Sequence, residues 1–201
     1  MDEFSYKTIA SPVGEVILKE KGSKFIGYAF PVCSENDVKG KLDIIRNEHP
    51  KATHHCYAYR LGKNGDLYRA NDDGEPSGSA GLPIYNQLLS NDITDILVIV
   101  VRYYGGTKLG VAGLIKAYRE TAKEVLSQTE EIIKKEVFLL KITSAYEKQG
   151  VMYQLINQFD GKMMSTNQHE KSQTTVSFLM EQKKDISELI SEMPDIEFEF
   201  L

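Results

Sequence analysis

Short apolar segments with alternating or β-branched residues recur along the chain and predict β-strands. In the first two thirds of the chain these segments cover residues 13–19, 24–32, 54–61 and 67–70. Glycine-containing turns separate the first pair and the second pair, which predicts two hairpins. A fifth segment, 96–103, is apolar on both faces, as is typical of a strand that is covered on each side. We expect this fifth strand to be central.

Apolar residues at helical spacing predict three helices in the same part of the chain. The first begins after Ser34, a suitable N-cap, and ends before Pro50. The second is short, covers residues 80–89 and has Ser79 as its candidate cap. The third, over 109–127, is the longest amphipathic helix of the chain.

The last third of the chain has a simple predicted order. A polar segment, 128–135, is interpreted as a linker. Strands and helices then alternate as βαββαβ; the predicted strands are 137–144, 162–169, 173–180 and 196–200. This ferredoxin-like order packs two helices on one face of an antiparallel sheet. The predicted fold class is therefore α+β, with domains over residues 1–130 and 135–201.

The composition is that of a globular protein. Hydrophobic residues make up 41% and charged residues 26% of the 201 residues. The longest apolar run, 96–101, is far shorter than the ~20 residues of a membrane-spanning helix. The first residues lack the order of a secretory signal, so we expect a cytoplasmic protein with no membrane partner. Cys33 and Cys56 are expected to be reduced. The oligomeric state does not follow from the sequence.

The net charge of −5 lies entirely in the second domain. Residues 1–135 contain 18 basic and 18 acidic residues, whereas the remainder contains 6 basic and 11 acidic ones. Nonspecific duplex binding depends on neutralising many phosphates. The charge balance therefore argues against such a binder, and any contact with nucleic acid must be local.

The loop before the second predicted helix is rich in acidic and small residues. Its candidate site residues are Asp72, Asp73, Gly74, Glu75, Ser77 and Ser79. Three carboxylates beside a helix start suit a hard cation or a partner's hydrogen-bond donors. The alternative, which we prefer, is an acidic turn that stabilises the helix dipole without a ligand. No metal ion, cofactor or catalytic acid–base pair is predicted.

A second candidate group surrounds the start of the third helix. It consists of Arg102, Tyr103, Tyr104, Gly105, Gly106, Lys108, Gly110, Lys116 and Arg119. Helix N–H groups with a lysine favour an anion, and arginine with tyrosine rings suits phosphate contact and base stacking. The alternatives are glycines that permit tight packing and tyrosines that are half-buried core residues. The glycine pattern is neither a phosphate loop nor a dinucleotide-binding motif.

His54, His55 and Cys56 are metal-binding residue types, but a zinc site is not predicted. Neighbouring residues of a strand point to opposite faces, so at most His54 and Cys56 face one ion. A closed zinc site needs two further ligands.

Three separated motifs occur together and in order: HHCYAYR at 54–60, the loop at 72–81 and VRYYGGTKLG at 101–110. With them the chain resembles the IMPACT/YigZ family over residues 11–126, and its tail is similar to the second domain of bacterial members. The resemblance implies a left-handed βαβ amino-terminal domain, like domains of a small-subunit ribosomal protein and of elongation factor G. It implies a second domain similar to the last domain of that elongation factor.

The resemblance also bears on function. Eukaryotic relatives modulate translation under amino-acid starvation, but through a partnership linked to a different additional domain. In the family, the two later motifs are proposed to border one surface that meets nucleic acid or the translation machinery. Where the family usually has glycine, this chain has Ala112, whose methyl group is expected to hinder close backbone approach.

The leading hypothesis is a non-enzymatic factor that binds RNA or the ribosome through Arg102, Lys108, Lys116 and Arg119. A first alternative is a metal-dependent enzyme that acts on a phosphorylated small molecule, with the carboxylates of the 72–75 loop holding the cation. A second alternative is a protein–protein adaptor that uses the acidic second domain.

Overall fold

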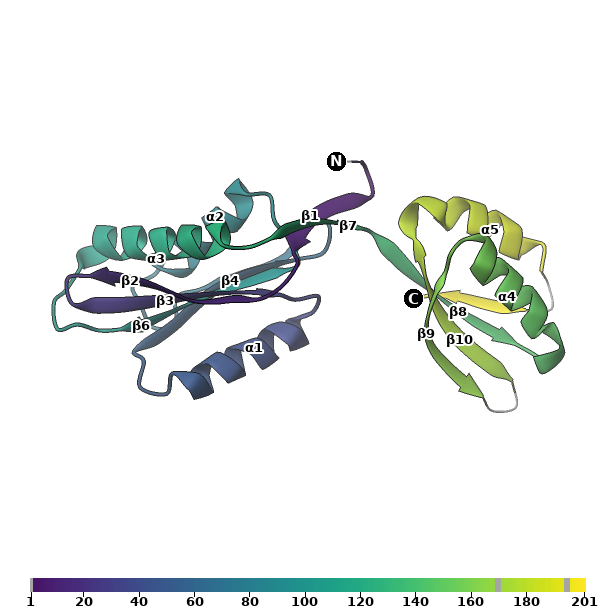
Figure 1. Cartoon of the computed structure of the whole chain (residues 1–201), viewed down its shortest axis with the longest axis horizontal. Helices are drawn as coiled ribbons and strands as arrows, with labels where there is room; N and C mark the ends of the chain where they lie inside the picture. Colours follow the sequence, from purple (N-terminus) through teal and green to yellow (C-terminus); the bar gives the residue numbers. More distant parts are fainter. Residues whose placement is uncertain (1, 169–170, 194–195) are drawn as a thin grey trace. The chain divides into compact units, whose positions relative to one another are not determined.

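The computed structural model describes residues 2–168, 171–193 and 196–201 (Figure 1). The chain folds into two compact units. One unit covers Tyr6–Lys134, and the other combines the first five residues with Lys135–Leu201. Antiparallel sheets with helices packed on them build both units, which confirms the α+β class. The left-handed βαβ likeness stays a prediction.

A five-stranded sheet forms the centre of the first unit. Its strands are β2 (Val13–Glu20), β3 (Ser23–Pro31), β4 (His54–Leu61), β5 (Leu67–Asn71) and β6 (Ile96–Tyr103). Their order is β2-β3-β6-β4-β5, and each neighbouring pair is antiparallel. The central position of β6 confirms the prediction from its apolar residues on both faces.

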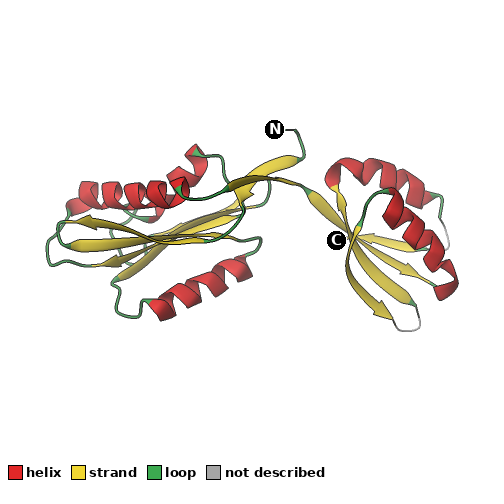
Figure 2. Ribbon diagram, viewed as in Figure 1, coloured by secondary structure: helices red, strands yellow, loops and turns green. Residues whose placement is uncertain are grey.

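Helices cover both faces of this sheet (Figure 2). Helix α1 (Glu35–Glu48) packs on one face, and α2 (Gly81–Ser90) and α3 (Gly110–Ser127) pack on the other. Strand β4 shows the predicted alternation, since Cys56 belongs to the α2/α3 core and Tyr57 to the α1 core. The loops that lead into α2 and α3 therefore start on the same side of the sheet.

The starts of α1 and α2 differ from each other. The predicted cap of α1 is confirmed, because Ser34 Oγ accepts a 3.1 Å hydrogen bond from the Asp37 N–H. The predicted cap of α2 is wrong. Ser79 is fully buried, and its hydroxyl has no hydrogen-bond partner within the described part of the chain. The helix start is held instead by Asp72, as shown below.

The predicted linker over 128–135 is also wrong in part. Residues Glu131–Lys135 form strand β7, which pairs with β1 (Ser5–Ile9) in a separate two-stranded sheet. The sequence pattern does not predict β1. The pairing joins segments more than a hundred residues apart, so neither strand has a local partner that sequence reading can detect.

The second unit has the predicted βαββαβ order. Its elements are β8 (Val137–Ser144), α4 (Gln149–Gln158), β9 (Lys162–Gln168), β10 (Ser172–Leu179), α5 (Lys183–Ser191) and β11 (Glu197–Phe200). The antiparallel strand order is β11-β8-β10-β9, and one core beneath the two helices includes Leu140, Leu155 and Ile186. His169, the predicted end of β9, lies outside the described residues. No helix in the described ranges is long and apolar enough to cross a membrane.

Candidate functional site

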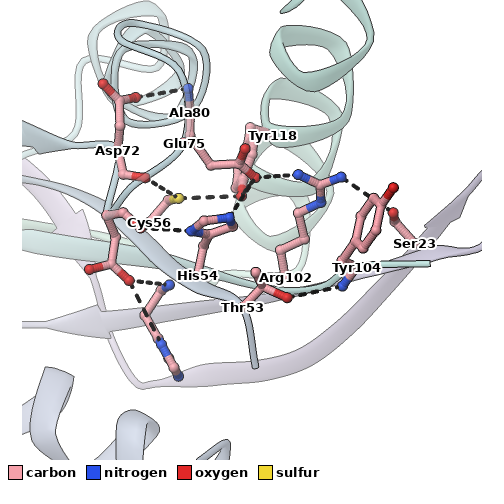
Figure 3. A network of polar contacts seen from close by, with 12 residues as sticks. Ser23, Thr53, His54, Cys56, Asp72, Glu75, Ala80, Arg102, Tyr104 and Tyr118 are labelled. Carbon is pink, nitrogen blue, oxygen red and sulfur yellow. Dashed lines mark hydrogen bonds and ion pairs between the residues drawn. The ribbon is translucent and has the colours of Figure 1, made fainter. Parts of the chain in front are cut away.

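The two candidate motifs meet on one side of the first unit's sheet, where the β5–α2 and β6–α3 loops come together (Figure 3). The turn between β2 and β3 joins them, because an added Cβ atom at Gly105 would come within 1.9 Å of the Gly22 backbone. Both positions therefore require glycine for close backbone approach.

A buried ion pair between Arg102 and Glu75 lies at the centre of this region. Arg102 Nη1 donates to Glu75 Oε1 over 2.6 Å, and both side chains are more than nine-tenths buried. The Tyr118 hydroxyl of α3 donates to the same oxygen over 2.8 Å. A buried charge needs a partner and further hydrogen bonds. Here one carboxylate oxygen links β6, α3 and the 72–81 loop.

The ion pair is part of a wider polar network (Figure 3). His54 lies directly opposite Arg102 on the neighbouring strand, and its Nε2 is 3.9 Å from Glu75 Oε1. Its Nδ1 donates to the Asp73 carbonyl oxygen over 2.7 Å. Ser23 Oγ accepts from Arg102 Nη2 (3.4 Å) and from the Gly105 N–H (3.2 Å). These contacts tie the two loops to the sheet.

Asp72 caps helix α2 from nine residues before its first residue. Its Oδ1 accepts from the N–H groups of Ala80 (3.0 Å) and Gly81 (2.8 Å), and its Oδ2 accepts from the Gly78 N–H (2.8 Å). A carboxylate at this end of a helix satisfies N–H groups and stabilises the helix dipole. The preferred reading of the acidic loop, a turn that supports a helix, describes Asp72 correctly.

Asp73 has a third, separate role. It adopts a left-handed conformation, with φ of 43°, and its Oδ2 accepts from the His55 N–H over 2.6 Å. Its Oδ1 lies 3.8 Å from Arg46 Nη2 of α1. Asp72, Asp73 and Glu75 thus point to three different partners. In the ranges that the structure describes, no group of three or more His, Cys, Asp or Glu side chains is placed to hold a metal ion.

Burial sets the protonation of several groups around the network. Desolvation raises the pKa of the Cys56 thiol, which donates to the Asp72 carbonyl oxygen over 3.0 Å. Desolvation also raises the pKa of Tyr118, so its hydroxyl stays protonated and donates to Glu75. On the other sheet face, burial lowers the pKa of His55, which is neutral at pH 7. Neither the thiol nor the phenol is an activated nucleophile.

The loop before α3 is, by contrast, open. Gly106 and Gly110 have positive φ values of 83° and 70°, and a side chain at either position would meet no described atom within 4 Å. Leu109 is the N-cap residue of α3, and no side chain of the described residues caps the helix there. The first turn has no acidic residue. This helix start therefore keeps its positive end available for an anion.

A groove of about 510 Å³ adjoins this helix start. Its lining residues are Glu75, Pro76, Arg102, Tyr104, Lys108, Leu109, Gly110, Val111 and Leu114. Tyr104 is half exposed, and the Arg102 guanidinium carbon lies 5.5 Å from the centre of its ring. Lys108 is exposed at the rim. The groove thus combines an aromatic ring, a cation and an uncapped helix start.

The other predicted residues are distributed over separate surfaces. Tyr103 points to the α1 face, where its hydroxyl lies 3.0 Å from His49 Nδ1. It does not join Tyr104 and Arg102. Lys116 and Arg119 are exposed on the outer face of α3, and Ser77 is exposed in the acidic loop. Ala112 is also exposed, so its methyl group is not packed inside the protein, and the expected hindrance of close backbone approach stays a prediction.

Sequence reading does not connect three members of the network. His54 is a candidate zinc ligand by residue type, whereas it faces Arg102 across the sheet. Tyr118 stands among the apolar positions of α3, and its spacing gives no sign of a bonded hydroxyl. Ser23 is the first residue of β3 and lies far from both motifs in the sequence. Predicting that β4 pairs with β6 would have placed His54 opposite Arg102.

Comparison with known proteins identifies the family of this chain. A family model described as the Impact N-terminal domain matches residues 21–126. The chain is 37% identical over 146 residues to "IMPACT family member YvyE" of Bacillus subtilis, covering 73% of this chain and 67% of the relative. It is 34% identical over 160 residues to "IMPACT family member YigZ" of Escherichia coli, covering 79% and 78%.

One solved structure covers both units. It is the crystal structure of a hypothetical protein, with 29% sequence identity and a TM-score of 0.78. The alignment covers 97% of this chain and 96% of that chain. The folds described above are therefore ones that an experimentally determined structure shares.

Proposed function

Because this chain belongs to the IMPACT family, we propose that it is a non-enzymatic factor in translational regulation that binds RNA or the ribosome. The family relation supports the translational role. The contact surface that we propose is the groove beside α3, with Tyr104 and Lys108 as the residues that meet the partner.

The observation that carries this proposal is the open helix start next to an exposed tyrosine. Phosphate oxygens suit the uncapped N-terminus of α3 together with Lys108. The exposed ring of Tyr104 suits an unstacked base, which is how single-stranded nucleic acid is usually recognised. The apolar side chains of Leu109 and Val111 line the same groove.

Arg102 has a different role in this proposal from the one expected of it. Its charge is paired with Glu75, and the residue is buried, so it is poorly placed to bind a phosphate directly. We assign it to positioning. Its guanidinium packs on the ring of Tyr104 and donates a hydrogen bond to Ser23 Oγ. The same oxygen accepts a hydrogen bond from the Gly105 N–H.

The outer face of α3 carries further cations, on a surface separate from the groove. Lys116, Arg119 and Lys123 are spaced by three and four residues, share one helix face and are exposed. Arg119 also contacts Glu120 over 3.1 Å, which reduces its net charge. A local row of cations on an otherwise balanced unit suits a backbone contact of limited length.

Co-sedimentation with ribosomes and with total RNA over a salt series tests the proposal. We expect salt-sensitive binding that the Tyr104→Ala/Lys108→Ala variant loses by about tenfold or more, from one stacking contact and one phosphate contact. Lys184→Ala is the matched control, because the Lys184 side chain is 85% exposed on α5 of the second unit. Equal binding by wild type and the double variant, or no binding at low salt, contradicts the proposal.

The metal-dependent enzyme has no comparable support. Asp72 and Glu75 are bound to backbone N–H groups and to Arg102, and Asp73 points elsewhere. No observation favours a cation among them, so we do not propose that function.

A further inference from the structure

Strand β5 is an edge strand of the first unit's sheet. Among the described residues, β4 is the strand that pairs with it, and their register runs without a break. Leu67 and Tyr68 of this strand are 49% and 56% exposed. The opposite edge, β2, has an irregular register and Glu15 at a φ of 60°. Bulged edges resist added strands, whereas regular ones accept them.

An apolar strip borders β5 on the α2 side of the sheet. The register places Tyr68 on this side, where its ring stacks on Tyr85 of α2 at a centroid distance of 4.8 Å. Leu82 and Leu89 lie three residues before and four residues after Tyr85, on the same helix face, and are 49% and 45% exposed. A contiguous exposed apolar patch often marks an interaction site.

A basic groove borders β5 on the α1 side. The groove measures about 370 Å³ and is lined by the cations Lys39, Arg46 and Arg69. One carboxylate, Glu35, also lines it and accepts a hydrogen bond from the Tyr59 hydroxyl. Arg46 lies 3.8 Å from Asp73. The charge left over in the groove is positive, which suits acidic side chains.

We propose that β5 binds an extended segment of a partner protein as a sixth strand of the sheet. Main-chain hydrogen bonds to the open edge provide affinity, and the side chains of the added strand alternate between the two faces. On the α1 face they are acidic and meet Arg69, Arg46 and Lys39. On the α2 face they are apolar and meet Tyr68, Leu82 and Leu89. This surface is separate from the groove beside α3 and does not depend on RNA binding.

A second copy of the chain is a poorer occupant of this edge. Arg69 is the middle residue of Leu67–Asn71, so a two-fold antiparallel pair that aligns the full length of both β5 strands places the two Arg69 side chains opposite each other. Like charges directly opposite one another destabilise a strand pair. An acidic segment removes this repulsion, and charge complementarity therefore favours a different protein.

Amide spectra of the ¹⁵N-labelled full chain, titrated with short synthetic peptides, test the proposal. A peptide of alternating Glu and Val is the probe, and one of alternating Lys and Val is its charge control. We expect the Glu/Val peptide to shift and protect amides of β5 and to bind more tightly than the Lys/Val peptide. Arg69→Glu should weaken the Glu/Val peptide by about fivefold and improve the Lys/Val peptide. Lys19→Glu, on the opposite edge strand, should change neither.

Three results overturn the proposal. The first is the absence of shifts in β5 at millimolar Glu/Val peptide. The second is binding that Arg69→Glu does not change. The third is concentration-dependent self-association in analytical ultracentrifugation together with protection of the β5 amides in the absence of peptide. That combination assigns the edge to a second copy. Loss of RNA binding in the Tyr104→Ala/Lys108→Ala variant affects none of these readouts, so the two proposals fail independently.

Discussion

The loops that lead into α2 and α3 are both rich in glycine and small residues, yet they use their polar groups in opposite ways. In the loop before α2, the carboxylates of Asp72 and Glu75 bind three backbone N–H groups and a buried guanidinium. In the loop before α3, no described side chain caps the helix, and Lys108 is exposed. The first loop stabilises the fold, and the second is available to a partner.

This difference shows that charged residues near a helix start do not by themselves mark a ligand site. The acidic loop has the stronger motif, but its charges are already matched within the protein. The glycine loop has few charges, but its backbone is exposed. Whether the polar groups of a loop already have partners within the protein decides which of two similar motifs can bind another molecule.

The largest effect should come from removing the charge of Glu75. Glu75→Gln leaves the Arg102 cation buried without its counter-ion, and we expect the free energy of unfolding to fall by about 3 to 5 kcal/mol. Urea denaturation measures the change. Glu75→Gln/Arg102→Met should recover part of the loss, because it removes the unpaired charge as well. A double variant that is less stable than the single one would argue that the guanidinium does not need Glu75.

Removing the cap of α2 should have the next largest effect. Asp72→Ala frees three N–H groups, and we expect a loss of about 2 kcal/mol in the free energy of unfolding. Lys108→Ala in the other loop is the comparison and should change stability by less than about 0.5 kcal/mol. Equal losses in the two variants would remove the distinction between a structural loop and an available one.

A smaller effect concerns the pH dependence of stability through His55, the β4 residue whose N–H donates to Asp73 of the acidic loop. Burial lowers the pKa of His55 below its usual value of 6.5, so the unfolded chain takes up a proton at this residue before the folded chain does. The stability from neutral His55 is present above about pH 6.5 and is lost as the pH falls through the folded pKa. Unfolding of wild type and His55→Gln at about pH 7.5 and about pH 5.5 measures this, and the variant should show the weaker pH dependence. Parallel pH profiles would contradict it.

A small effect should also come from Ala112→Gly. Ala112 is exposed in the first turn of α3, so the substitution removes helix propensity and little else. We expect the free energy of unfolding to fall by about 0.5 to 1 kcal/mol, measured by thermal unfolding, and co-sedimentation with RNA to stay unchanged. A gain in RNA binding would show instead that the methyl group obstructs the groove.

Much of the fold followed from local patterns. The apolar residues on both faces of 96–103 predicted a central strand, and the spacing over 109–127 predicted α3. Ser34 and Asp37 predicted the start of α1 because a cap and the N–H that it binds are three residues apart. Each of these signals lies within one element, where backbone geometry alone decides which residues meet.

The sequence by itself therefore determined the α+β class, the order of the elements other than β1 and β7, and the two loops in which to look for a site. Only the tertiary structure decided that Asp72 replaces Ser79 as the cap of α2, that β7 pairs with β1, and that Arg102 is buried against Glu75 and Tyr118. These contacts join distant segments of the chain. They depend on the order of strands in the sheet, and periodicity does not encode that order. Whether a charge meets a partner or solvent depends on the same packing, and so does the choice between a structural loop and a binding surface.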